Sequence, residues 1–222
     1  AKIDWLVFIG LGVLSLVPSL AGVVRVAGLA SGTGMAPDNA RFYAMPLPVV
    51  IHIICATLFC VLGIFQLAPN FRRRRLGWHR RVGWLLAPCG VGAGLSGLWM
   101  TQIYPLYPSI QDEVLYGLRI VFGSAMVVSI ILSMAAILRR DIAGHRAWMI
   151  RGYAIGQGAG TQAVIGIPLF LIAGDQGGWV RNVMMGAGWV INVAVAEWII
   201  RRKRAARQQP APAPAAGIMS QA

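Results

Sequence analysis

The stretch LPVVIHIICATLFCVLGIFQLA, residues 47–68, contains no charged residue and is followed at residues 69–81 by PNFRRRRLGWHRR. An apolar run of about 20 residues is long enough to cross the hydrocarbon core of a bilayer as an α-helix. Arginines concentrated directly after such a run are typical of the cytoplasmic surface. These two stretches therefore predict a membrane-spanning helix whose C-terminal end is cytoplasmic.

Further apolar runs of similar length predict a bundle of about six such helices. They occupy residues 5–26, 82–104, 114–138, 148–172 and 179–200. The whole chain agrees with this interpretation, since 57% of its residues are hydrophobic, 12% are charged and the mean hydropathy is +0.66. We expect an all-α polytopic membrane protein over residues 1–204, with a retained first helix and a disordered cytoplasmic tail over residues 205–222.

Basic residues are distributed very unequally between the two sides of the predicted bundle. Most of the 20 Lys and Arg residues fall on the side that carries both termini, and the exceptions are Arg25, Arg41, Arg119 and Arg181. This asymmetry predicts that both termini are cytoplasmic, in a bacterial inner membrane. The net charge of +13 sits mainly at the ends of apolar runs, which favours anionic lipid as a partner and argues against nucleic acid.

Small residues and prolines inside the runs predict how the helices pack. Glycines recur at every fourth position at Gly90 and Gly94, and at Gly152, Gly156 and Gly160. Such spacing allows two helix backbones to approach closely, so we interpret these positions as packing seams. Pro18 and Pro168 are expected to kink the first and fifth helices.

Two histidines begin predicted helices on the cytoplasmic side in a weak internal repeat. His79-Arg80 follows the second run and His145-Arg146 follows the fourth, so each forms the turn of a helical hairpin. One interpretation is that these turns, together with Arg151, bind lipid phosphate. The alternative is that His79 and His145 face one another and ligate a single haem b.

His52 lies at the opposite end of the second run, too far from the other histidines to share a ligand with them. Over the 16 residues to the inner end of that run a helix rises about 24 Å. His52 is interpreted as a hydrogen-bonding residue between helices, or as a contact for a quinone or lipid headgroup. Arg119 occupies the matching place in the second hairpin and is expected to extend outward or to pair with Asp112 or Glu113.

Uncharged amides and one carboxylate complete the set of polar residues within the runs. Gln66, Gln157, Gln162 and Asn192 are expected to hydrogen-bond between helices. Glu197 has two candidate partners, Arg201 four residues later or an arginine from the set Arg80, Arg146 and Arg151. Without an ionisable group at the membrane midplane, and without hydrolase or P-loop patterns, no reaction is indicated.

Several of these positions resemble a known family. The resemblance rests on His52 with Gly63-Ile-Phe65-Gln66, on Gly77-Trp-His79-Arg80-Arg81-Val-Gly83, on His145-Arg146-Ala-Trp148-Met149-Ile-Arg151, and on Trp189-Val-Ile-Asn192 with Ala196-Glu197-Trp198. Together they resemble, over about residues 48–204, the bacterial predicted membrane proteins catalogued as domain of unknown function 2306. The resemblance implies a polytopic membrane protein in which Glu197, Asn192, Gln66 and the histidines are family features, and it implies no reaction.

Taken together, the residues favour a non-enzymatic membrane protein. Its polar turns are expected to bind lipid headgroups or an accessory membrane protein at the cytoplasmic face. Electron transfer through a haem between His79 and His145 is the second hypothesis.

Overall fold

The computed structural model describes residues 2–104, 112–174 and 177–208, and every regular element in these ranges is a helix. The elements are α1 Lys2–Ser31, α2 Ala40–Ala44, α3 Pro46–Leu67, α4 Pro69–Arg74, α5 Leu76–Ile103, α6 Glu113–Leu138, α7 Ile142–Gly156, α8 Gly158–Ala173 and α9 Gly178–Gln208. Six segments are long and apolar enough to cross a membrane, with α7 and α8 together forming the fifth. The predicted all-α membrane bundle is confirmed.

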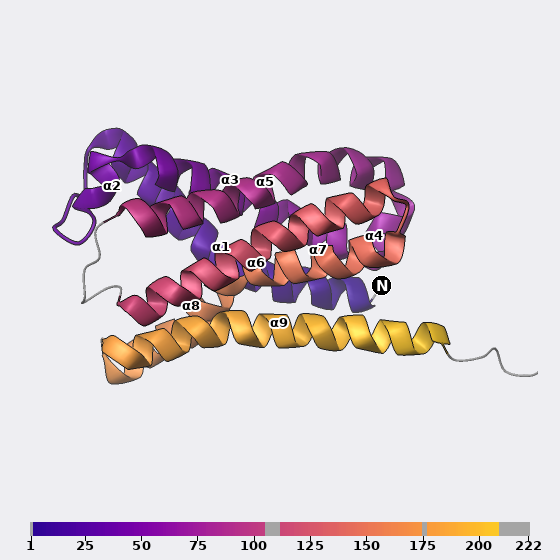
Figure 1. Cartoon of the computed structure of the whole chain (residues 1–222). Coiled ribbons are helices and arrows are strands. Elements are labelled where there is room, and N and C mark those ends of the chain that lie inside the picture. Colours follow the sequence, from indigo (N-terminus) through magenta and orange to yellow (C-terminus); the bar gives the residue numbers. More distant parts are fainter. Residues whose placement is uncertain (1, 105–111, 175–176, 209–222) are drawn as a thin grey trace, which may run out of the picture.

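The two predicted hairpins form the centre of the bundle. α3 packs against α5, α6 packs against α7, and α5 joins the pairs by packing against α6 (Figure 1). Their shared core is built around Phe59, Met126, Ile130 and Tyr153. α1 covers α3 and α8, while α9 covers α7 and α8, so flanking helices surround the hairpins as expected.

The two ends of the bundle differ in charge. The start of α1, the arginine-rich α4 and the far end of α9 lie together at one end of the molecule, which we call the basic end (Figure 1). α2 lies at the opposite end. Large hydrophobic side chains such as Leu6, Val24 and Ile172 are exposed along the sides, which suits contact with lipid tails.

The fifth predicted helix is divided in two, which corrects the prediction of one helix kinked at Pro168. α7 ends at Gly156 and α8 begins at Gly158, whereas Pro168 lies within α8. Gln157 between them has ψ near 0° and is flanked by two glycines, the residues that stabilise a helix least apart from proline. Its side-chain amide donates to Ser15 Oγ at 2.9 Å and to Tyr153 Oη at 2.8 Å.

Two boundaries also need correction. α5 begins at Leu76, before the predicted start at residue 82, because charged residues continue a helix that hydropathy alone cannot detect. α9 continues to Gln208, so residues 205–208 are helical and do not belong to the predicted tail. Residues 209–222, the rest of that tail, lie outside the described residues.

The predicted glycine seams are confirmed as close contacts. A Cβ added at Gly90 would lie 2.6 Å from both Phe59 Cε2 and Ile130 Cδ1, and one at Gly94 would lie 2.5 Å from Val127 Cγ2. Gly160 faces the backbone of Leu14 on α1 even more closely. A side chain at Gly160 would force α1 and α8 apart, and one at Gly90 or Gly94 would displace the side chains packed against it.

Candidate functional site

His79 and His145 lie near one another at the basic end, an arrangement that the haem hypothesis requires. They lie on α5 and α7 and are close enough to interact electrostatically. His145 Nδ1 is 2.9 Å from Ser133 Oγ and 3.1 Å from the Ser133 carbonyl oxygen. A carbonyl only accepts, so Nδ1 carries the proton and Nε2 keeps its lone pair. His79 Nδ1 is buried without a hydrogen-bond partner.

Glu197 joins α9 to α7 through Arg151, which settles the choice of its partner. Arg151 Nε lies 2.5 Å from Oε1 and Nη2 lies 3.1 Å from Oε2, a two-pronged ion pair. The Arg151 guanidinium also lies over the Trp148 ring, 4.6 Å from its centroid. Arg151 therefore fastens two helices together, which is one of the two roles that the sequence suggested for it; the other was binding lipid phosphate.

A small groove at the basic end, which we call the basic groove, lies between α7 and α9. It has a volume of about 40 Å³. The residues that line it are Ala143, Arg146, Ala147, Ile150, Ile200, Lys203 and Arg204. Lys203 experiences electrostatic repulsion from Arg146 and Arg72. The groove therefore combines an apolar floor with several cationic side chains gathered in one place.

The predicted anion-binding residues are divided among different places. Arg146 lines the basic groove, while Arg80 lies in α5 near His79. Lys203 and Arg204 were not singled out, because in the sequence they are part of a cluster that indicates only membrane orientation. Arg119 is near the opposite end, where it lines a second and much larger space.

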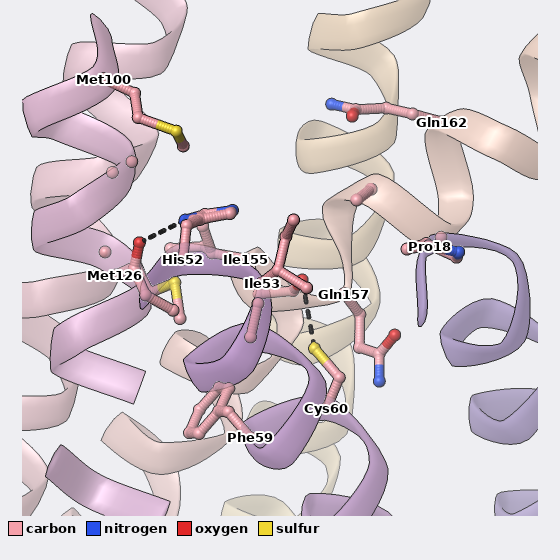
Figure 2. Close-up of a pocket in the computed structure, with 18 of the residues that line it drawn as sticks. Pro18, His52, Ile53, Phe59, Cys60, Met100, Met126, Ile155, Gln157 and Gln162 are labelled. Carbon is pink, nitrogen blue, oxygen red and sulfur yellow. Dashed lines mark hydrogen bonds between the residues drawn. The ribbon is translucent and has the colours of Figure 1, made fainter. Parts of the chain in front are cut away.

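This second space, the central cavity, has a volume of about 410 Å³ and extends from the opposite end toward the middle of the bundle. Its wall is mostly apolar, and Phe59, Met100 and Met126 contribute to it (Figure 2). His52 and Arg119 both line it. Sequence reasoning treated these two residues separately, although the repeat placed them at matching positions of the two hairpins.

The His52 ring extends from α3 into the central cavity (Figure 2). Its Nδ1 lies 2.9 Å from the Ala93 carbonyl oxygen and 3.3 Å from Ser96 Oγ. Because the carbonyl can only accept, Nδ1 carries the proton, and Nε2 is left as an acceptor on the far side of the ring. The predicted hydrogen bond to a neighbouring helix is thus confirmed. It also fixes the His52 tautomer, so that the ring offers an acceptor to the central cavity.

Of the two alternatives for Arg119, the described residues do not show the ion pair with Asp112 or Glu113. Asp112 instead accepts from Leu115 N at 2.9 Å and from Asn182 Nδ2 at 2.5 Å. In the part of the chain that the structure describes, no carboxylate forms an ion pair with Arg119. Its guanidinium therefore remains in the cavity wall.

The amides act as predicted, with one exception. Asn192 accepts from Thr161 Oγ1 at 2.7 Å and donates to the Ala154 carbonyl at 3.1 Å, and Gln162 donates to the Met185 carbonyl at 2.8 Å. Gln66 differs, because both polar atoms of its amide are buried without a hydrogen-bond partner.

Within the described ranges, no group of three or more His, Cys, Asp or Glu residues could hold a metal ion. The helices and their apolar surfaces define the protein as a polytopic α-helical integral membrane protein. More specifically, it belongs to the family described as predicted membrane protein (DUF2306), whose model matches residues 49–200. No curated protein and no solved structure matches the chain.

Proposed function

We propose that this protein binds the headgroup of an anionic membrane lipid in the basic groove, with the basic end at the cytoplasmic face of a bacterial inner membrane. The observation that carries the proposal is the gathering of Arg146, Lys203 and Arg204 around an apolar floor between α7 and α9. An anionic lipid is complementary to both features, since its phosphate would pair with the cationic side chains and its chains would contact the apolar floor.

Electrostatics supports an anion at this position. Lys203 lies close enough to Arg146 and Arg72 for mutual repulsion, and a bound phosphate would relieve it. Glu197 is the nearby carboxylate on α9, but Arg151 already holds both of its oxygens. Ile150 and Ile200 line the groove beside the cations, where they could contact the first part of an acyl chain.

The test is lipid binding to the variant K203Q/R204Q. Each basic residue near an anionic surface contributes about 1 kcal/mol, so losing two of them weakens binding by about 2 kcal/mol. This corresponds to about 30-fold in affinity. Native mass spectrometry of the detergent-solubilised protein, titrated with cardiolipin and with phosphatidylcholine, measures the effect.

The matched control is R201Q/R202Q, which removes the same charge from the same helix at residues that do not line the groove. Arg202 instead lies over the Trp198 ring. Equal loss of cardiolipin from both variants would show general attraction to the surface and refute the groove. Unchanged lipid binding with loss of a co-purifying protein would identify an accessory partner as the occupant.

Haem b binding by His79 and His145 is the second candidate. It is favoured by two imidazoles near one another, one oriented through Ser133 and the other with a buried, unpartnered Nδ1. Purified protein would then show a Soret band that His79→Phe removes and His52→Phe retains. A colourless wild-type preparation from haem-supplemented cells would eliminate this candidate.

A further inference from the structure

Two of the polar residues that line the central cavity, His52 and Arg119, come from matching positions of the two hairpins. His52 and Arg119 each stand six residues after the first residue of their helices, Pro46 and Glu113. At 1.5 Å per residue both lie about 9 Å along the helix from that start. α3 and α6 both begin at the end opposite the basic one (Figure 1). The two side chains therefore line one cavity at a similar depth.

These two groups offer complementary hydrogen bonds. His52 Nε2 is an acceptor, because Nδ1 carries the proton that is donated to Ala93. Arg119 brings only donors and a positive charge, and no carboxylate of the described chain is paired with it. A ligand that satisfies both must present a hydroxyl to one side and an oxygen acceptor to the other.

The space around them selects an apolar ligand. Phe59, Met100 and Met126 contribute to the wall, and the volume of about 410 Å³ lies within the range of about 300–1,000 Å³ for small-molecule sites. Gly97 leaves room for the His52 ring, since a Cβ there would lie 3.4 Å from His52 Cε1. The cavity therefore suits a ring compound that is soluble in lipid.

We propose that the central cavity binds a lipid-soluble quinol. One hydroxyl donates to His52 Nε2, and the second oxygen accepts from Arg119. A fatty-acid carboxylate would satisfy Arg119 but has no proton for His52 Nε2. The oxidised quinone has the same limitation, because its carbonyl oxygens only accept. The site therefore prefers the reduced form.

Decylubiquinol and decylubiquinone test this preference, because they share one tail and differ at the ring oxygens. Isothermal titration calorimetry of the purified full chain under anaerobic conditions should show decylubiquinol binding about tenfold tighter, the effect of one buried hydrogen bond. His52→Phe removes the acceptor and keeps an aromatic ring, so both forms should bind it with equal, weaker affinity. Arg119→Met should weaken both forms to a similar degree.

Two controls separate this site from other effects. Met100→Leu changes the apolar wall without altering either hydrogen bond, so the preference for the reduced form should persist. K203Q/R204Q alters the basic groove and should leave quinol binding unchanged, which keeps this test independent of the proposed lipid site. Equal affinity of wild type for both forms, or binding of neither, would overturn the proposal. Displacement of decylubiquinol by decanoate at equal concentration would identify a fatty acid as the ligand instead.

Discussion

Gly160→Ala is expected to separate α1 from α8. The added Cβ would lie 2.6 Å from the Leu14 carbonyl carbon and 2.8 Å from Leu14 Cα. Carbon atoms in contact rest at about 3.5–4.0 Å, so the two helices must move apart by about 1 Å. The obstacle is backbone, which cannot rotate away as a side chain can. Overpacking of this kind costs about 1–3 kcal/mol.

The displacement should also weaken the neighbouring contact between the Gln157 amide and Ser15 Oγ, now 2.9 Å long. For a chain of this size, 2 kcal/mol corresponds to a fall in Tm of about 4–8 °C. A thiol-reactive fluorophore can follow unfolding in detergent, because Cys55, Cys60 and Cys89 are free and at least partly buried.

Gly166→Ala is the matched control on the same helix. A Cβ at Gly166 meets nothing within 4 Å, so the substitution adds helix propensity without a clash. Its Tm should equal or slightly exceed that of wild type. If Gly160→Ala unfolded at the same temperature as Gly166→Ala, the inferred contact between α1 and α8 would be wrong.

Further predictions concern ion pairing and pH. Glu197→Gln leaves Arg151 without its carboxylate and should lower the free energy of unfolding by about 2 kcal/mol, as for hydrogen bonds to charged groups. The double variant with Arg151→Gln should recover part of the lost Tm. Losses that add in the double variant would exclude coupling between the two residues. A hydrogen bond from Leu115 N, and to a smaller extent one from Asn182, holds the pKa of Asp112 below its ordinary value near 3.8. Ionised Asp112 therefore stabilises the fold fully at a pH above its ordinary pKa. This stabilisation is lost as the pH falls through the lower pKa of the folded state. The protection of the Leu115 amide against exchange, relative to its intrinsic rate at each pH, should therefore fall in acid. Asp112→Asn should remove that pH dependence, and the same fall in the variant would contradict the assignment.

Hydropathy predicted the spans because a bilayer selects for length and apolarity, and both properties are local in sequence. It could not predict the division at Gln157, because the residues on both sides continue the apolar run. Nor could it detect the first two turns of α5, which are helical although His79, Arg80 and Arg81 are polar. Local conformation and local polarity are separate properties at these positions.

The candidate sites were harder to predict than the fold. The His-Arg repeat placed His79 and His145 at the same end of the bundle, since both open helices that follow hairpin turns, and in the structure they are close enough to interact electrostatically. The central cavity could not be predicted from apolar runs, because its volume depends on which side chains of six helices fail to fill the centre. The matching positions of His52 and Arg119 were the signal available in the sequence.

The break at Gln157 explains why polar side chains occur within the hydrocarbon layer. Where α7 gives way to α8, Gly160 N donates to the Gln157 carbonyl at 3.1 Å, and side chains donate to the carbonyls of Ala154 and Gly156. Asn192 Nδ2 donates to the Ala154 carbonyl at 3.1 Å, and the Cys60 thiol donates to the Gly156 carbonyl at 3.5 Å. In lipid no water can replace a missing partner. An amide from one helix and a thiol from another thus donate to these two carbonyls in place of backbone N–H groups, and replacing either residue by one without a donor would leave a carbonyl unsatisfied.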